Sequence, residues 1–300
     1  MKEGSFARNQ SFVLANSAVG IAAQLVFTPI ITRLYAPEAY GTMNAVISLS
    51  AMALPFFTFQ YDSALLMARN ERDIQGLRAI SNLLPVLFSV LLFVALLIGG
   101  DGLLTAVGLP ALGAMALLIP GLVILSALMQ TGQQMVAVRM RYKQSFVSGS
   151  ISAVGTKLTA IGYGFLFGGG AIGLITAEVF SRSSQLFINS RFILHERFHW
   201  HPKRLDTVGI RSVMRSYVSF PKYELPAVGI AQLAAQVPLW WLPRTYGLAI
   251  FGQYGLSLAL LEMPMRLFSH SIAGTFYQKA AQVFHAGGAQ ALRSITFRTM

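Results

Sequence analysis

The residues of this sequence that could act chemically are ionisable side chains inside long apolar segments. Lys157 lies about 11 residues from either end of the apolar segment 146–167, which corresponds to ~16 Å of helix at a rise of ~1.5 Å per residue. A lysine side chain extends by only ~6 Å and cannot reach the membrane surface from that depth. Because a charge at the centre of a bilayer costs at least ~2.5 kcal/mol, Lys157 is expected to face a water-filled cavity, with a packing ion pair as the alternative.

A second polar set lies in the apolar segment 171–191. Glu178, Arg182, Gln185 and Asn189 follow one another at i, i+4, i+7 and i+11, which places them on one face of a helix. Such a face should point into the protein interior or a cavity rather than into lipid. Glu178 and Arg182 can also pair along the helix, and an inert intrahelical pair is the alternative interpretation.

Further polar side chains occupy positions from which they could line the same cavity. Asp62 and Glu262, together with Glu178, are candidates for ion coupling or for ion pairs, and an ion pair is the more usual role of a residue such as Asp62. Lys222 could equally be an ordinary cytoplasmic anchor. The predicted cavity residues are Lys157, Arg33, Gln24, Glu178, Arg182, Lys222, Gln236 and Arg266.

No residue pattern predicts covalent catalysis, a metal site or a cofactor. The sequence contains no cysteine, which excludes thiolate metal sites and thiol catalysis. His195, His199 and His201 lie close together, but no second ligand cluster is near them, and a segment at the membrane interface is the preferred interpretation. Motifs such as the P-loop and G-x-S-x-G are absent, so the chain is not expected to be an enzyme.

The elements that must position these residues are predicted to be membrane-spanning helices of an all-α polytopic protein. Hydrophobic residues make up 54% of the 300-residue sequence, charged residues only 11%, and the mean hydropathy is +0.58. A hydrocarbon core of ~30 Å requires apolar segments of ~20 residues. Eight such segments occur, at 11–32, 42–61, 80–99, 112–135, 146–167, 171–191, 221–243 and 247–269.

The positive charges predict how the chain is oriented. Lys and Arg gather at the N-terminus and in every second connection, as in Arg69, Arg72 and Arg78 after the second segment, whereas the alternate connections are nearly bare. This alternation places the N-terminus on the cytoplasmic side of a bacterial inner (plasma) membrane. It also accounts for the net charge of +12 without a nucleic-acid partner.

An internal repeat relates the beginning of the chain to the region after residue 226. The sequence Ala-Val-Gly-Ile-Ala occurs at both 18–22 and 227–231. A second shared pattern, Arg-x-Tyr-x4-aromatic-Gly, lies in the polar connection that follows, where chance similarity between apolar helices is a weaker explanation. Its residues are Arg33, Tyr35, Tyr40 and Gly41 in one copy and Arg244, Tyr246, Phe251 and Gly252 in the other, at a constant offset of 211 residues.

The repeat predicts two six-helix lobes. Six segments separate the copies, so both copies enter the membrane from the same side, and the lobes are parallel. The first lobe is expected to cover residues 1–210. Residues 211–300 supply the seventh and eighth segments and the start of a ninth, so the second lobe is expected to be incomplete and the chain a piece of a longer protein.

Three stretches of the chain resemble a known family. They are the connection 33–41, the stretch 60–69 that ends the second segment, and Phe-Pro-Lys-Tyr at 220–223 with the Pro-Leu at 238–239. Together they resemble the polysaccharide-transport flippases of the multidrug/oligosaccharidyl-lipid/polysaccharide exporter superfamily. The resemblance covers essentially the whole chain, and the motifs mark the family but not the sugar.

The resemblance implies two lobes that face each other across a cavity and transport by alternating access. The implied cargo is an undecaprenyl-pyrophosphate-linked oligosaccharide for O-antigen (lipopolysaccharide) or exopolysaccharide biosynthesis, moved from the cytoplasmic to the periplasmic leaflet without a cofactor. The implied partners are this lipid-linked oligosaccharide and membrane lipids, with polysaccharide polymerase and chain-length proteins as further candidates.

Two other functions stay open as alternatives. A cation-coupled multidrug exporter of the same superfamily is expected to carry an acidic coupling residue in its first span, and residues 11–32 contain neither Asp nor Glu. A membrane-embedded polysaccharide polymerase or ligase is expected to need a large external loop to hold the sugar. If each span takes ~20 residues, the external connections here have about a dozen residues or fewer.

Overall fold

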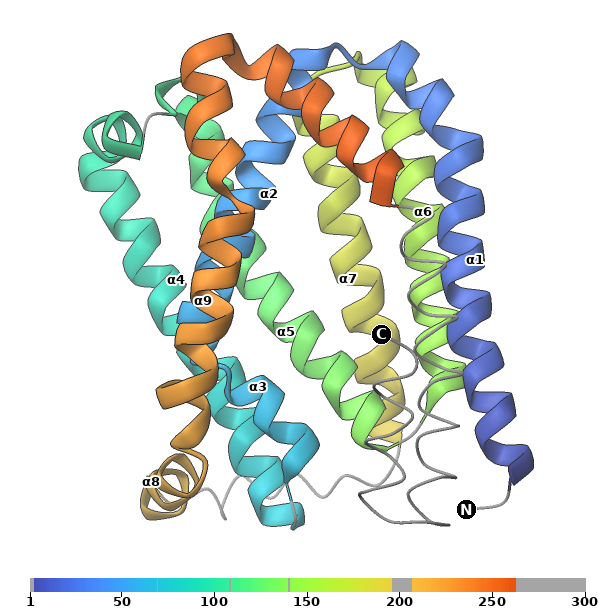
Figure 1. Ribbon diagram of the computed structural model, residues 1–300, viewed down its shortest axis with the longest axis vertical. Coiled ribbons are helices and arrows are strands. Elements are labelled where there is room, and N and C mark those ends of the chain that lie inside the picture. The colour runs from blue at the N-terminus through green and yellow to red at the C-terminus, as the bar shows by residue number, and fades with distance from the viewer. Residues whose placement is uncertain (1–2, 69, 108, 140, 196–206, 263–300) are drawn as a thin grey trace, which may run out of the picture.

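The computed structural model describes residues 3–68, 70–107, 109–139, 141–195 and 207–262. These residues form helices and connections and contain no β-strand. Figure 1 shows that the long helices run roughly along one axis, with most connections at the two ends of the molecule. The prediction of an all-α polytopic membrane protein is confirmed, since several of these helices are long and apolar enough to cross a bilayer.

The helical elements follow one another with short connections. A last helical stretch, 237–262, is interrupted at Gly247, whose φ of +83° lies in the left-handed region that favours glycine. The preceding elements are α1 (Glu3–Leu34), α2 (Pro37–Thr58), α3 (Tyr61–Ala64), the 3-10 helix η1 (Leu65–Met67), α4 (Glu71–Val107), the 3-10 helix η2 (Pro110–Leu117), α5 (Leu118–Val138), α6 (Tyr142–Phe167), α7 (Ala171–His195), α8 (Thr207–Ser216), the π-helix η4 (Phe220–Glu224) and α9 (Leu225–Ala235).

The apolar stretches differ in detail from the predicted segments. The predicted segments 221–243 and 247–269 fall largely in one apolar stretch of 43 residues, Phe220–Glu262, which is about twice the ~20 residues that one crossing needs. Helices α6 and α7 have 26 and 25 residues, but their polar residues keep them out of this most apolar group. Within the described residues the group comprises Leu14–Leu34, Pro37–Thr58, Glu71–Gly100, Leu112–Val138 and Phe220–Glu262.

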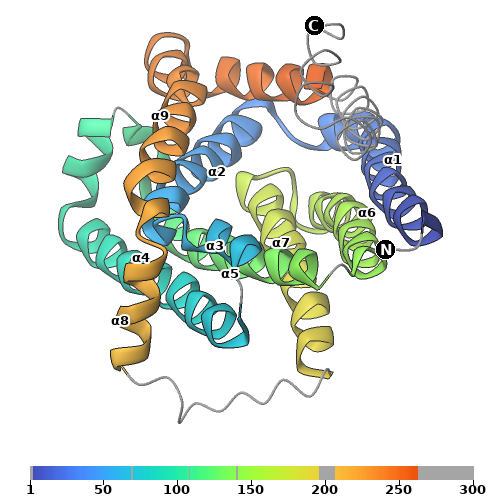
Figure 2. The same ribbon diagram turned by 60° about the horizontal axis from the view of Figure 1, so that its bottom comes forward.

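The α1–α2 connection is fixed by Tyr35. This side chain is 3% exposed, and its hydroxyl donates to the backbone carbonyl of Ala160 on α6 at 2.7 Å. Gly164 and Gly173 make room for it, because a Cβ at Gly164 would lie 3.1 Å from the Tyr35 ring and one at Gly173 would overlap the Tyr35 hydroxyl. Tyr35 therefore holds the end of α1 against both α6 and α7. Helix α6 packs on α1 and on α7 along much of its length (Figures 1 and 2).

The two copies of the repeated motif contact each other. A Cβ at Gly252 would overlap the carbonyl oxygen of Pro37 and would lie 2.6 Å from the backbone nitrogen of Gly41. A Cβ at Gly41 would in turn overlap the carbonyl oxygen of Leu248. The start of α2 and the stretch 248–255 therefore cross with their backbones in direct contact, and only glycine fits at the crossing. We call this contact the glycine crossing.

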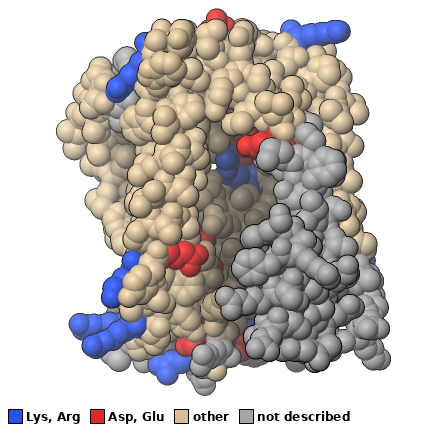
Figure 3. All heavy atoms as spheres, in the orientation of Figure 1, with Lys and Arg blue, Asp and Glu red and all other residues tan. Residues whose placement is uncertain are grey.

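The glycine crossing lies at one end of the molecule. Figure 1 shows the chain rising through α9, turning at the end where α1 joins α2, and descending again in the last described residues. The opposite end carries α3, α8 and the start of α4. In Figure 3 most of the visible Lys and Arg atoms lie at this second end, which we call the basic end. Its described arginines include Arg72, Arg139, Arg211 and Arg215.

Candidate functional site

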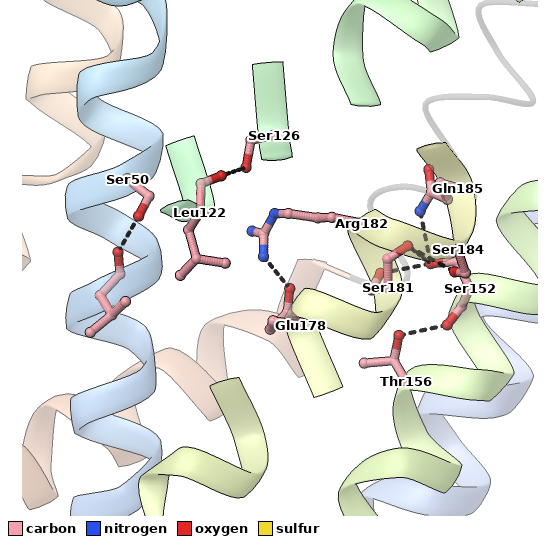
Figure 4. A network of polar contacts seen from close by, with 11 residues as sticks. Ser50, Leu122, Ser126, Ser152, Thr156, Glu178, Ser181, Arg182, Ser184 and Gln185 are labelled. Atoms are coloured by element: carbon pink, nitrogen blue, oxygen red, sulfur yellow. Dashed lines mark hydrogen bonds and ion pairs between the residues drawn. The ribbon is translucent and has the colours of Figure 1, made fainter. Parts of the chain in front are cut away.

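A network of polar side chains joins α6, α7 and α5. The hydroxyl oxygens of Ser152 on α6 and Ser181 on α7 lie 2.6 Å apart, and the Gln185 amide donates to the Ser152 hydroxyl at 2.8 Å. The Gln133 amide of α5 donates to the Gln185 side-chain oxygen at 2.5 Å. Figure 4 shows Ser152, Ser181 and Gln185 converging between α6 and α7. We call Gln133, Ser152, Ser181 and Gln185 the polar network.

The predicted Glu178–Arg182 pair is present beside this network. An Arg182 guanidinium nitrogen lies 3.1 Å from a Glu178 carboxylate oxygen, one turn apart on α7. The side chains are 15% exposed for Arg182 and 30% exposed for Glu178, so neither is fully sealed from solvent. In Figure 4 the Arg182 side chain extends away from Ser152, on the other side of α7 from the polar network.

Lys157 brings a second cation to the same level of the bundle. It lies on α6, one residue after Thr156, whose hydroxyl donates to the Ser152 carbonyl at 2.6 Å. Its side chain is half-buried, and the Lys157 ammonium makes no hydrogen bond or ion pair with any described residue. It is also not among the polar atoms sealed from solvent. The charge of Glu178 acts on Lys157 without a direct ion pair between them.

Lys157, Glu178 and Arg182 together form what we call the charge cluster. Two cations and one carboxylate give this cluster a net charge of +1 within the apolar part of the bundle. Figure 3 shows the molecule hollowed beside α9, with Lys or Arg atoms and Asp or Glu atoms visible within the hollow. An arrangement of this kind can accept an anionic group, with hydroxyl and amide groups of the polar network nearby for neutral polar groups.

The remaining predicted cavity residues do not join the charge cluster. Arg33 is exposed beside the α1–α2 connection, and Lys222 is exposed at the basic end with its ammonium 4.9 Å from the Tyr223 ring centre. Gln236 follows the end of α9, and its backbone N–H donates to the Gln232 carbonyl at 3.1 Å. Gln24 and Glu262 are half-buried, and Arg266 lies outside the described residues. The histidine-rich stretch 196–201 also lies outside them.

Asp62 lies at the basic end rather than beside the charge cluster. It is fully buried in α3, and its Oδ2 accepts a hydrogen bond from the Gln130 amide of α5 at 2.5 Å. Within the part of the chain that the structure describes, Asp62 forms no ion pair. The sequence favoured an ion pair for Asp62, whereas in the structure its side-chain partner is the neutral amide of Gln130.

Sequence reasoning missed the serines and glutamines of the polar network other than Gln185. Ser152 and Gln133 carry no charge, and single uncharged polar residues occur in many membrane helices. The available signal was the spacing of Ser152, Thr156 and Lys157 on α6, which places them near one another on the helix surface. Their partners on α5 and α7 depend on how the helices are rotated against one another, which the sequence pattern of one helix does not specify.

Comparison with known protein families bears on this arrangement. The family model described as "polysaccharide biosynthesis protein" matches residues 30–295. The chain belongs to this family. No curated protein and no solved structure matches the chain significantly. The family match covers both copies of the Arg-x-Tyr-x4-aromatic-Gly pattern and the whole of the polar network and charge cluster.

Proposed function

We propose that this protein is a flippase that moves undecaprenyl-pyrophosphate-linked oligosaccharide units from the cytoplasmic to the periplasmic leaflet by alternating access. Membership of the polysaccharide biosynthesis family supports a role in making or moving polysaccharide. The multi-pass helical structure supports a role within the membrane. The finer assignment, a flippase for O-antigen or exopolysaccharide units, depends on the charge cluster.

The observation that carries the proposal is the unpaired ammonium of Lys157 within the bundle. A cation without an ion-pair partner at this depth is costly unless water or an anionic ligand reaches it. A pyrophosphate is such a ligand, because its negative charges also need cations once they leave the membrane surface. Lys157 and Arg182 would bind the pyrophosphate.

Transport of this kind requires no covalent chemistry. The charge cluster would bind the pyrophosphate on one side of the membrane and release it on the other as the bundle changes conformation. The residues named here bind and orient the cargo, so the proposal treats the protein as a transporter and not as an enzyme. Polysaccharide polymerase and chain-length proteins are the proposed partners that would receive the transported units.

The proposed location is the bacterial inner membrane, with the basic end on the cytoplasmic side. Lys and Arg are most frequent in cytoplasmic connections of membrane proteins, and the basic end carries the start of α4 and all of α8. This orientation puts the N-terminal end of α1 in the cytoplasm and the glycine crossing on the periplasmic side. The lipid-linked cargo would then enter from the end where Lys222 is exposed.

A cation-coupled multidrug exporter is the second candidate function. Two observations favour the flippase over it. The membrane-spanning part of α1, Leu14–Leu34, contains no acidic residue that could bind a coupling cation. The charge cluster is also net positive, whereas a site for cationic drugs should be net negative.

Charge changes in the cluster should alter pyrophosphate binding in opposite directions. Glu178→Gln removes the carboxylate of the charge cluster and is expected to tighten binding of an undecaprenyl-pyrophosphate-linked oligosaccharide about 5- to 10-fold. Arg182→Gln removes a cation and should weaken this binding about 10-fold or more. Binding would be measured with the full chain in lipid nanodiscs, with uncharged undecaprenol as the comparison ligand.

Arg191→Gln is the matched control, because Arg191 lies on the same helix but is exposed. It should leave the affinity unchanged. Equal effects of the Arg182 and Arg191 variants, or equal binding of the pyrophosphate-linked ligand and undecaprenol, would contradict a pyrophosphate site at the charge cluster.

A further inference from the structure

The connection between α2 and α3 holds two residues in an unusual backbone conformation. Phe59 and Gln60 have φ values of 51° and 56°, and neither is a glycine. Side chains with a Cβ rarely adopt this left-handed region, and they persist there only where the surrounding structure holds them. Here the Gln60 backbone N–H donates to the Thr58 hydroxyl at 3.3 Å, and the Ser63 hydroxyl donates to the Gln60 side chain at 3.1 Å.

This sharp turn carries Asp62 into the interior of the basic end. The Asp62 side chain has no exposed surface, and its Oδ2 accepts from the Gln130 amide of α5. Its Oδ1 is sealed from solvent and makes no well-directed hydrogen bond with any described residue. The Thr58 hydroxyl and the backbone N–H groups of Asp62 and Ser63 lie near the carboxyl, but the Thr58 hydroxyl has the Pro55 carbonyl as an acceptor at 3.4 Å.

Among the described residues, no cation on the elements that pack on α3 forms an ion pair with Asp62. These elements are η1, α4, α5, η4 and α8, the last through the Tyr61 hydroxyl, which donates to the Met214 carbonyl at 3.4 Å. Neither η1 nor α5 contains an ionisable residue. Among the described groups near the basic end, Glu71 pairs with Arg139, and the Tyr217 hydroxyl donates to Asp73. Besides its hydrogen-bonding neighbours, Asp62 receives no contribution from the ionisable groups around it. These groups are Glu71, Arg72, Asp73 and Arg78 at the start of α4, Lys222, Tyr223 and Glu224 on η4, and Arg211 and Arg215 on α8.

We propose that Asp62 is a proton-binding site at a hinge between α2 and α3. In the structure described here Oδ1 carries the proton, and the neutral carboxyl stays buried against Gln130 while Phe59 and Gln60 hold the turn. When the turn relaxes and Asp62 reaches water, the proton passes from Oδ1 to water and the carboxylate remains. Proton binding therefore favours the conformation in which α3 is packed on α5.

A proton fits the surroundings of Asp62 better than a metal cation does. A bound Na⁺ or similar ion needs several oxygen ligands around it. The side chain that approaches Asp62 from α5 instead presents an N–H group, which a cation would repel. Oδ1 is sealed from solvent and makes no well-directed hydrogen bond within the described part of the chain, so a proton on Oδ1 displaces no donor. Burial raises the pKa of Asp62, against the smaller opposing effect of its hydrogen-bonding neighbours Thr58 and Gln130.

Because burial raises the pKa of Asp62, the stability of the folded protein should decrease as the pH rises. A carboxyl whose pKa is higher in the folded protein than in the unfolded chain stabilises the fold below its unfolded pKa of about 3.9. That contribution is lost as the pH rises through the folded pKa, because the buried group must then ionise or the hinge must open. Asn cannot ionise, so Asp62→Asn keeps the neutral state at every pH.

The test compares the full chain with its Asp62→Asn variant in detergent. The thermal midpoint of the wild type should fall relative to Asp62→Asn, by several degrees, as the pH is raised between about 4 and about 9. Infrared spectra at about pH 6, two units above the ordinary pKa of an aspartic acid, should show a protonated-carboxyl band in the wild type that Asp62→Asn lacks. Asp73→Asn on α4 is the matched control and should reproduce the wild-type pH profile and band.

Two results would overturn the proposal. One is a protonated-carboxyl band that is absent at about pH 6 or unchanged in Asp62→Asn. The other is a difference in thermal midpoint between wild type and Asp62→Asn that stays constant over the whole pH range, which a purely structural role of the side chain predicts. Neither measurement uses a lipid-linked cargo, so the proton site can fail or stand independently of the proposed flippase function.

Discussion

Lys157→Ala is expected to abolish surface polysaccharide in cells that depend on this protein, while the amount of protein in the membrane stays normal. Lys157 is the cation of the charge cluster that has no partner among the described residues, so it is free to bind an anionic ligand. Losing one charged contact to a buried anion typically costs on the order of 3 kcal/mol, which corresponds to about a 100-fold loss of affinity. Protein packing should tolerate the change, because no ion pair is broken.

Two further variants make this prediction specific. Lys157→Arg keeps the positive charge and should retain part of the activity, whereas Lys143→Ala removes an exposed lysine from the same helix and should behave like the wild type. Surface polysaccharide would be measured by immunoblot, with the amount of each variant protein quantified in isolated membranes. Unchanged polysaccharide in Lys157→Ala would remove Lys157 from the mechanism. A similar loss in Lys143→Ala would show that any charge on α6 matters, not the cavity position.

Gly252→Ala should strongly destabilise the protein. Its Cβ would overlap the Pro37 carbonyl oxygen and lie 2.6 Å from the Gly41 nitrogen, and both contacts are backbone atoms that cannot rotate away. The two segments of the glycine crossing must therefore separate, at a cost of about 3 kcal/mol or more. For a chain of this size we expect the thermal midpoint to fall by on the order of 10 °C.

Gly121→Ala is the control for this prediction. Gly121 lies on α5, and a Cβ there would have nothing within 4 Å. Its thermal midpoint should match that of the wild type in the same detergent. A Gly252→Ala protein as stable as Gly121→Ala would mean that the two segments are not in backbone contact.

Some parts of the fold could be predicted because local sequence determines them. The boundary between 146–167 and 171–191 was placed correctly because three consecutive glycines, 168–170, separate the apolar stretches and Gly168 adopts a φ of 87°. Helix α2 instead ends at Thr58, three residues before the predicted end. The left-handed residues there, Phe59 and Gln60, are neither glycine nor proline, and the turn is held by the hydrogen bonds of Gln60 with Thr58 and Ser63.

The sequence predicted several residues of the candidate site, but not which residues of different helices come together there. The spacing of Glu178 and Arg182 along one helix was enough to predict their pairing, because both lie on the same face. Arg33 and Lys222 were also expected to line the cavity, yet both are exposed near the ends of helices. Which residues of different helices meet depends on helix rotation and crossing, and the contact between Gly41 and Gly252 shows this most directly. Their repeated motif was visible in sequence, but not that its two copies pack on each other.

The most direct test of the account is translocation by the purified chain in liposomes. A fluorescently labelled undecaprenyl-pyrophosphate-linked oligosaccharide would be placed in both leaflets, and a membrane-impermeant quencher would report how much of the label reaches the outer surface over time. The account predicts that the wild type exposes the inner-leaflet label far faster than protein-free liposomes do and that Lys157→Ala does not. Label that crosses no faster with the wild type than without protein, or equally fast with Lys157→Ala, would contradict it.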